Sequence, residues 1–325
     1  MMAKLDDVAK LAGVSVTTVS RVINQYGYLS QKTIDKVYAA MRELNYLPNT
    51  AARSLQGKAT NLIGLIFPDV SEPFFGEMVQ RLENIFFSHG YKVILCNSGV
   101  DRQKEREHLR MLLANKVDGI ITGTHNADVA GYENSSAPII SFDRSLAAGI
   151  PIVSSDNLAG GRLAAETLLA AGAKKLVIIT GVNAPGFPTY GRYEGFVDYL
   201  AAHSIKPAVH RCLGPTPTLK AMQLQSILRN CEADGYFCTS DPTAIMLMCE
   251  AQKLSLRIPD DIKVVGYDAT SLVRSLFPTL TTIAQPIEDC AILLADLLRQ
   301  RIANPQVGLE RNYILPVQLL RGTSA

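Results

Sequence analysis

The sequence predicts an α/β protein with an N-terminal all-α helix-turn-helix head and a two-lobed body, in which each lobe is a parallel sheet flanked by helices. Three observations support this. Short amphipathic helical patterns occupy the first 48 residues, apolar β runs alternate with helical stretches from Asn61 onward, and this alternation occurs twice. Because the chain has 325 residues and is 47% apolar, it can bury more than one core, and we expect several domains.

The head is predicted from three short helices. The first spans 5–11 and ends at Gly13, a residue that tolerates positive φ. Ser15 is a good N-cap for a second helix over 16–23, and a third helix is expected over 33–44 with Ser30 near its start. Two helices joined by a tight glycine turn form a helix-turn-helix, and the third completes a small core.

The second helix carries the candidate DNA-reading residues. Its Val19, Val22 and Ile23 can pack inward, which leaves a second set free for other contacts: Val16, Thr17, Ser20 and Arg21. In this motif the N-terminal half of the helix enters the major groove, where arginine can bond to guanine and methyl groups can contact thymine. From these residues alone, a helical hairpin without a ligand remains the alternative.

The runs 5–24, 44–49 and 52–57 resemble the lactose/galactose repressor family, with the family's spacing kept. The resemblance implies a hinge helix over 49–57 that pairs with its dimer mate in the minor groove, where Leu55 would wedge between base pairs. From the residues alone, Leu55 could instead anchor the linker on the body. The candidate DNA-binding residues are Ser15, Val16, Thr17, Thr18, Ser20, Arg21, Asn24, Ala52, Ser54, Leu55 and Gln56.

The body is predicted from buried β runs that alternate with helices. In the first half we expect strands at 62–67, 92–96, 119–122 and 139–142, with helices at 74–89 and 101–115. In the second half we expect strands at 175–181, 235–239 and 263–267, a helix at 193–203, and a later helix at 287–301. Two such lobes face each other, and ligands bind at the carboxyl ends of their strands.

Polar and aromatic residues follow several of these strands. Taken singly, each has a structural explanation, such as a helix cap or a core position. Together they indicate a polar small-molecule site, and aromatic rings suit the apolar face of a sugar. The candidate effector-binding residues are Asp69, Phe74, Phe75, His125, Asp143, Arg144, Arg192, Asp241, Asp268 and Gln285.

The family resemblance continues through the body. The run 192–196 resembles the family's R-x-x-G-F, whose arginine clamps the effector, and 264–268 and 280–286 are further landmarks. Ser240 and Ala269 depart from the family pattern, which usually has asparagine and a second acid there. Within the family, the runs 52–58, 141–144, 150–157 and 313–316 are most similar to repressors of sucrose operons.

The resemblance also implies the domain boundaries. These are a helix-turn-helix domain at 1–48, a hinge helix and linker at 49–60, and an effector-binding and dimerisation domain at 61–325. Its periplasmic-binding-protein-like lobes would comprise about 61–157 with 286–313, and about 158–285 with 314–325.

Composition limits the function classes. The first 60 residues carry a net charge of +4 and the rest −2, which indicates a polyanionic partner at one end only. The chain lacks a long apolar run and a basic-then-apolar leader, so we expect a cytoplasmic protein with no membrane contact. Its six cysteines and five histidines show no CxxC, HxH or HxxxH spacing, so we expect no metal and no cofactor.

The sequence therefore predicts a homodimeric repressor that binds palindromic double-stranded operator DNA of a sugar operon, with sucrose the favoured sugar. A sugar or sugar phosphate between the lobes would control DNA binding, and the resemblance implies that it releases the operator. Arg144 and Arg192 suit a phosphate as well as hydroxyls. No heptad extension is present, so we expect a dimer. The rival hypotheses are a cytosolic sugar-binding protein without DNA, or an enzyme using Asp143, Asp241 or Asp268, although no nucleophile or phosphate-binding motif is found.

Overall fold

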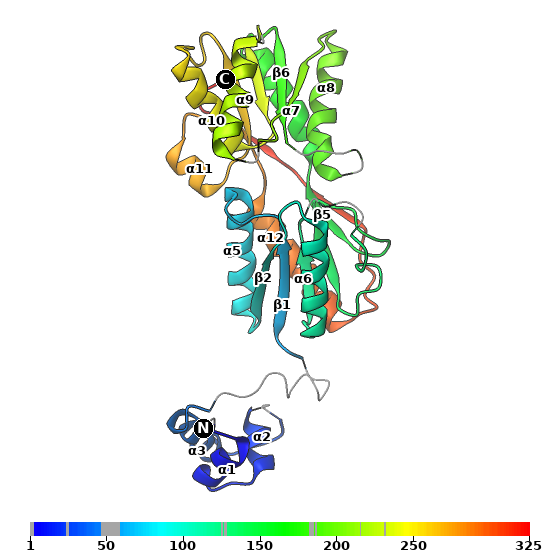
Figure 1. The fold of residues 1–325 in the computed structure, drawn as a ribbon. Helices are drawn as coiled ribbons and strands as arrows, with labels where there is room; N and C mark the ends of the chain where they lie inside the picture. The colour runs from blue at the N-terminus through cyan, green and yellow to red at the C-terminus, as the bar shows by residue number, and fades with distance from the viewer. Residues whose placement is uncertain are drawn as a thin grey trace. The chain divides into compact units, whose positions relative to one another are not determined.

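A computed structural model describes residues 3–23, 26–46, 59–124, 126, 129–181, 185, 187–214, 216–230 and 232–325. The chain forms two compact units, Met1–Thr60 and Asn61–Ala325 (Figure 1). The predicted hinge helix at 49–57 lies outside the described residues.

The head unit contains three helices in its described residues, α1 (Leu5–Ala12), α2 (Val16–Ile23) and α3 (Gln31–Glu43). Gly13 ends α1 with φ +64°, as its lack of a side chain allows. The α3 helix begins at Gln31, earlier than the predicted residue 33, because Ser30 is its N-cap and accepts a hydrogen bond from the Thr33 amide. The core of the unit contains the fully buried Val8, Val19 and Val37.

The body unit contains two six-stranded sheets. The first has the order β11-β5-β4-β3-β1-β2 and the second the order β12-β10-β9-β8-β6-β7. We call the first sheet with its helices lobe 1 and the second lobe 2. The strands of lobe 1 are β1 (Leu62–Phe67), β2 (Lys92–Asn97), β3 (Gly119–Thr122), β4 (Ile139–Phe142), β5 (Ile152–Ser155) and β11 (Asn312–Leu315). Those of lobe 2 are β6 (Leu176–Thr180), β7 (Ala208–Arg211), β8 (Gly235–Cys238), β9 (Lys263–Asp268), β10 (Thr281–Ala284) and β12 (Gln318–Leu320).

Neighbouring strands run parallel, with the exception of β12, which is antiparallel to β10. Central strands such as β3 and β8 are buried at every position, because helices cover both faces of a parallel sheet. This explains why they appear in the sequence as continuous apolar runs. The carboxyl ends of the parallel strands meet at one edge of each sheet, where polar side chains from several strands come together.

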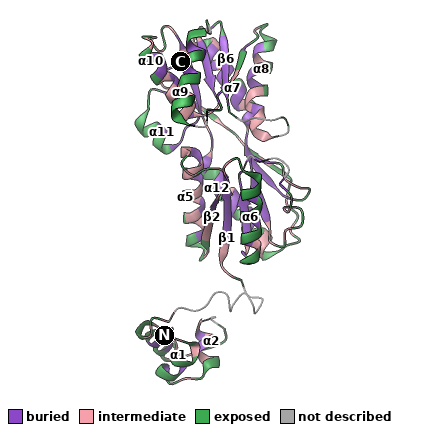
Figure 2. Cartoon of the chain, viewed as in Figure 1, coloured by how far each residue is buried: buried purple, intermediate pink, exposed green. Residues whose placement is uncertain are grey.

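Helices cover both faces of each sheet, and Figure 2 shows the buried strands between them. In lobe 1, α5 and α12 contribute to one core cluster and α6 to another. In lobe 2, α7 and α8 pack on one face, and α9 and α10 on the other. The lobe 1 helices are α5 (Pro73–Ser88), α6 (Arg102–Ala114) and α12 (Ile287–Ala303). Those of lobe 2 are α7 (Asn157–Ala170), α8 (Gly191–Ala202), α9 (Pro217–Asn230), α10 (Asp241–Lys253), α11 (Ser271–Leu276) and the 3-10 helix η1 (Pro188–Tyr190).

The chain passes between the lobes at three places: from β5 into α7, from β10 into α12, and from β11 into β12. The family resemblance implies such crossings near residues 157, 285 and 313. Consequently α12 packs in lobe 1, although the strand before it belongs to lobe 2.

The predicted fold class is confirmed: an all-α head precedes two parallel-dominated lobes. In the described part of the chain, no helix has both the length and the apolar content of a membrane span. Cys96, Cys212, Cys238, Cys249 and Cys290 are free thiols, and Cys249 alone among these five is exposed.

Candidate functional sites

The α2 helix presents the face that the sequence predicts for DNA. Val16 and Thr17 are exposed, while Val19 and Val22 are buried on the opposite side. Ser15 is the cap of the helix: its Oγ accepts from the Thr18 amide at 3.1 Å and lies 2.9 Å from Thr18 Oγ1. The hydroxyls of Ser15 and Thr18 thus stabilise the start of the helix.

Arg21 lies against the loop that follows α2. Its Nε donates to the Tyr26 carbonyl oxygen at 3.3 Å, and the Tyr26 amide donates to the Arg21 carbonyl oxygen. This hydrogen bond restricts the orientation of the guanidinium beside the face that the sequence predicts for DNA. The candidates Asn24, Ala52, Ser54, Leu55 and Gln56 lie outside the described residues.

Two tyrosines in that loop escaped the sequence analysis. The side chains of Tyr26 and Tyr28 are 73% and 94% exposed. A tyrosine hydroxyl can donate to a phosphate oxygen, and such contacts fix the register of a protein on a duplex. The sequence contains a signal for them, because two aromatic residues stand in a short loop directly after α2.

In the body unit, Arg192 of α8 joins polar groups at the carboxyl ends of the lobe 2 strands. Its Nε donates to Asn157 Oδ1 at 2.7 Å, and its Nη1 donates to the Thr239 carbonyl oxygen at 2.8 Å. Asp268 Oδ1 lies 3.7 Å from Nη1, and the guanidinium carbon lies 3.8 Å from the centre of the Tyr267 ring. These contacts fix the guanidinium in one orientation.

The same network continues into lobe 1. Asn157 Nδ2 donates to Asp143 Oδ1 at 3.1 Å. Gln285, between β10 and α12, donates from Nε2 to Asp268 Oδ1 at 2.7 Å and accepts from Ser155 Oγ at 2.8 Å. Hydrogen bonds thus join both lobes through two of the crossings. We call this set the interlobe cluster: Asp143, Ser155, Asn157, Arg192, Asp268 and Gln285.

The interlobe cluster contains four of the predicted effector-binding residues and two that the sequence analysis missed. Ser155 ends a buried strand and Asn157 begins the next helix. The rule that drew attention to Asp143, a polar residue directly after a buried strand, could have drawn attention to both.

Burial dominates the electrostatics of the cluster. It raises the pKa of Asp143 to about 6, against the opposing effect of Arg192 and the hydrogen bond from Asn157. It also raises the pKa of Asp268, and Asp241 adds to this while Arg192 opposes it. Two buried carboxyl groups therefore share a single guanidinium within the cluster, an arrangement that favours hydroxyl donors over a further anion.

Other predicted effector residues lie elsewhere. Asp69 is exposed, and its Oδ1 accepts from the Ser71 amide at 2.9 Å in the turn before α5. Phe74 is buried in the lobe 1 core and stacks on Phe142, with ring centres 5.6 Å apart. Phe75 is half-buried next to Phe74. His125 lies outside the described residues.

Asp241 is fully buried inside lobe 2. Its Oδ2 accepts from the Ala269 amide at 2.6 Å and its Oδ1 from Thr282 Oγ1 at 2.6 Å. A Cβ at Gly266 would lie 2.2 Å from that Oδ1, so only glycine allows this approach. Asp241 Oδ2 thus holds the backbone directly after Asp268, and Oδ1 holds Thr282 of β10.

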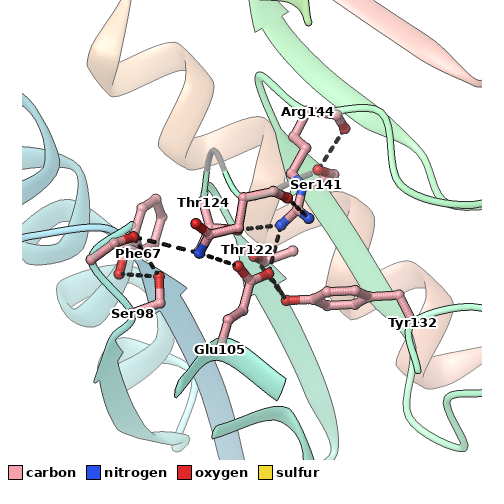
Figure 3. Close-up of polar contacts among 10 residues, drawn as sticks. Phe67, Ser98, Glu105, Thr122, Thr124, Tyr132, Ser141 and Arg144 are labelled. Carbon is pink, nitrogen blue, oxygen red and sulfur yellow. Dashed lines mark hydrogen bonds and ion pairs between the residues drawn. The ribbon is translucent and has the colours of Figure 1, made fainter. Parts of the chain in front are cut away.

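Arg144 also differs from the prediction, because its guanidinium is buried within lobe 1. Nη1 donates to Glu105 Oε1 at 2.6 Å and to Thr124 Oγ1, and Nη2 donates to the Asn126 carbonyl oxygen (Figure 3). The sequence placed Arg144 correctly after a buried strand. It could not show that Glu105, 39 residues earlier on α6, would pair with it.

A cavity of about 520 Å³ adjoins the interlobe cluster. Residues of both lobes line it, among them Ile152 and Asn312 of lobe 1 and Phe187 and Gly191 of lobe 2. Ser155 and Asn157 border this cavity and also belong to the interlobe cluster. Open volume is therefore present beside the polar network.

Both parts of the chain match known families. Residues 4–49 match the bacterial regulatory proteins of the lacI family, and residues 165–325 match the periplasmic binding protein-like domain. The sucrose operon repressor of Pediococcus pentosaceus is 54% identical over 326 residues, and that of Streptococcus mutans 51% identical over 324 residues, with 100% of both chains covered in each comparison.

A solved structure extends the similarity to the fold. The crystal structure of the lac repressor dimer bound to operator and the anti-inducer ONPF matches with a TM-score of 0.84 at 28% identity, and covers 100% of this chain and 99% of that chain. The helix-turn-helix head, the two-lobed body and full-length identity above 50% agree. The chain therefore belongs to the LacI family of bacterial regulatory proteins.

Proposed function

We propose that the chain is a homodimeric, cytoplasmic repressor of a sucrose operon, whose affinity for operator DNA is controlled by a sugar bound at the interlobe cluster. The observation that carries the proposal is the hydrogen-bonded network that joins Asp143 of lobe 1 to Arg192 and Asp268 of lobe 2. The full-length identity to two sucrose operon repressors supports the choice of operon.

The DNA side rests on α2. Its exposed Val16 and Thr17, with Arg21 beside them, discriminate between bases in the major groove. One such helix reads only a few base pairs, so two copies related by a two-fold axis read a palindrome. Lysines and arginines of the head supply affinity for phosphates, which depends on salt concentration.

The sugar side rests on complementary hydrogen bonding. Carboxylate oxygens of Asp143 and Asp268 accept from sugar hydroxyls, and Arg192 donates to hydroxyl or ring oxygens. Because Arg144 is paired with Glu105 inside lobe 1, Arg192 is the cation that faces the two acids. We therefore propose a neutral sugar in preference to a sugar phosphate.

The coupling between the two sites follows from the position of the cluster. A sugar that contacts groups of both lobes favours one relative orientation of the lobes and so shifts the population that binds DNA. A tenfold change in operator affinity requires only about 1.4 kcal/mol of coupling free energy. The proposal assigns no catalytic residue: it gives Asp143 and Asp268 to sugar binding, and Asp241 uses both oxygens in hydrogen bonds within lobe 2.

The test uses fluorescence anisotropy of a labelled palindromic duplex from upstream of the gene, because the chain contains no tryptophan. Titrations are run alone and with sucrose, fructose and their phosphates. We expect tight binding that a neutral sugar weakens. Relief by a phosphorylated sugar only would contradict the neutral ligand, and binding no tighter than to scrambled DNA would contradict the repressor.

A further inference from the structure

We propose that Glu105 and Arg144 form a buried ion pair whose role is to position the Asp143 carboxylate for sugar binding. This inference rests on the proposed function, because it concerns the lobe 1 side of the same sugar site. It replaces direct sugar contact by Arg144 with an indirect role through the neighbouring residue. Thr124, Asn126 and Tyr132 complete what we call the Glu105–Arg144 cluster.

The cluster is closed to solvent and its hydrogen bonds are nearly all internal. Glu105 is 0% and Arg144 2% exposed. Glu105 Oε1 accepts from Arg144 Nη1 and from the Tyr132 hydroxyl, each at 2.6 Å, and its Oε2 accepts from Asn126 Nδ2 at 2.8 Å (Figure 3). The donors come from different loops at the carboxyl edge of the lobe 1 sheet, so the pair ties these loops to α6.

Asp143 lies directly beside this anchor in an unusual backbone conformation. Its φ is +49°, in the left-handed region that non-glycine residues rarely adopt. The Asp143 amide donates to the Val153 carbonyl oxygen at 2.9 Å, and the Arg144 carbonyl oxygen accepts from Ser141 Oγ at 2.7 Å. The backbone is therefore held on both sides of Asp143, and the buried guanidinium fixes its next neighbour.

A role in stability alone does not account for this arrangement. Burial of two charges costs solvation free energy, and apolar side chains of similar volume stabilise a core at least as well in many proteins. An ion pair fixes the orientation of its two side chains, because a guanidinium group binds a carboxylate in only a few geometries. An apolar pair imposes no such orientation. At Asp143 the orientation that the ion pair fixes sets where the carboxylate meets Asn157 and the sugar.

The test compares sugar affinity with stability in four variants of the full chain. The double variant Glu105→Gln/Arg144→Met removes both charges together and so avoids an unpaired buried charge. Tyr132→Phe removes one hydrogen bond to Glu105, and Asp143→Asn removes the sugar-facing carboxylate itself. Leu112→Ala, a fully buried residue on the same helix as Glu105, is the matched control for loss of stability in lobe 1.

Sucrose and fructose binding is measured by calorimetry, melting temperature by circular dichroism, and operator affinity without sugar by anisotropy. For the sugar that wild type binds, we expect about a tenfold loss of affinity in the double variant and about a threefold loss in Tyr132→Phe. Leu112→Ala should melt at least as early as the double variant and bind sugar like wild type. Operator affinity without sugar should stay within about twofold in these three variants.

The two proposals fail in different ways. If Asp143→Asn loses sugar binding while the double variant and Tyr132→Phe bind like wild type, the positioning role is wrong and the sugar site stands. If the double variant does not fold, unchanged sugar affinity in Tyr132→Phe shows by itself that the positioning role is wrong. If Asp143→Asn binds sugar like wild type, or if wild type binds neither sugar, the proposed sugar site fails and the positioning role fails with it.

Discussion

Asp143 and Asp268 show how strongly burial acts on single residues of this protein. Both have positive φ, both are almost completely buried, and burial raises the pKa of each. Such groups weaken the fold when they ionise, since they lose hydration that the unfolded chain would keep. Two such carboxyl groups beside one arginine lower the stability of the fold, which supports the proposal that they are present for ligand binding.

The raised pKa of Asp143 predicts a pH effect on stability. Its folded value of about 6 exceeds the unfolded value of about 3.9, so the folded state binds more protons between these values. The Asp143 contribution to the unfolding free energy therefore falls as pH rises from about 4 through 6, by up to roughly 3 kcal/mol. Relative to wild type, Asp143→Asn should gain stability between pH 4.5 and 7.5 in denaturant titrations. If the unfolding free energies of Asp143→Asn and wild type differ by the same amount at pH 4.5 and at pH 7.5, the raised pKa of Asp143 is contradicted.

At the scale of elements, we propose that α2 contacts bases and that the loop after it contacts phosphates. Arg21→Ala removes the proposed base contact, so we expect a loss of about 1–3 kcal/mol in binding free energy on operator DNA and a much smaller loss on scrambled DNA. Tyr28→Ala removes the proposed phosphate contact and should weaken binding to operator DNA and to scrambled DNA by a similar factor. Anisotropy at one fixed salt concentration measures all four affinities. If the ratio of operator affinity to scrambled-DNA affinity is the same in Arg21→Ala and Tyr28→Ala, the separate roles of α2 and the loop are contradicted.

The helices α5 and α11 form a second contact between the lobes. Glu77 of α5 accepts from the Ser271 amide at 2.7 Å and from Ser271 Oγ at 2.8 Å, at the start of α11. Arg81 joins Glu77 to Glu288 of α12, with its Nη1 2.7 Å from Glu288 Oε2. The contact stabilises the relative orientation of the lobes seen here, and we expect its loss to shift the population toward a different lobe orientation.

We expect Glu77→Gln to change sugar affinity and operator affinity in opposite directions, each by about two- to fivefold, because the two ligands are linked through one lobe equilibrium. Glu83→Gln on the same helix is the matched control and should change neither. Calorimetry gives the sugar affinity and anisotropy the operator affinity. If both affinities move in the same direction, or neither moves, the contact does not govern the lobe equilibrium.

The sequence predicted these elements well where the determining contacts are local. The α2 helix spans the predicted residues because its cap, Ser15, directly precedes it and its inward valines lie within it. The apolar strands were evident in the sequence because helices cover both faces of each sheet. Arg144 shows where such prediction ends. Its partners on α6 and in the loop at Thr124 and Asn126 are distant in sequence. Only the fold therefore shows that its guanidinium is paired inside lobe 1.

At the scale of the whole molecule, one compact unit carries the DNA-reading helix and the other carries the interlobe cluster. In the proposed function, sugar and operator therefore bind to different units, and the orientation of the lobes couples the two sites. Arg192 contacts Asn157 at one crossing and approaches Asp268, which Gln285 holds at another. The contacts of Arg192 itself lie within lobe 2, and in the proposed function the bound sugar joins Arg192 to Asp143 of lobe 1.

The most direct test of this account is the operator affinity of Arg192→Ala across a sugar titration, followed by anisotropy beside wild type. Arg162→Ala, which removes an exposed arginine paired with Glu166 on α7, is the matched control. We expect all three proteins to bind operator equally well without sugar, and sugar to release wild type and Arg162→Ala but not Arg192→Ala. Normal release of Arg192→Ala by sugar would contradict the assignment of the interlobe cluster as the effector site.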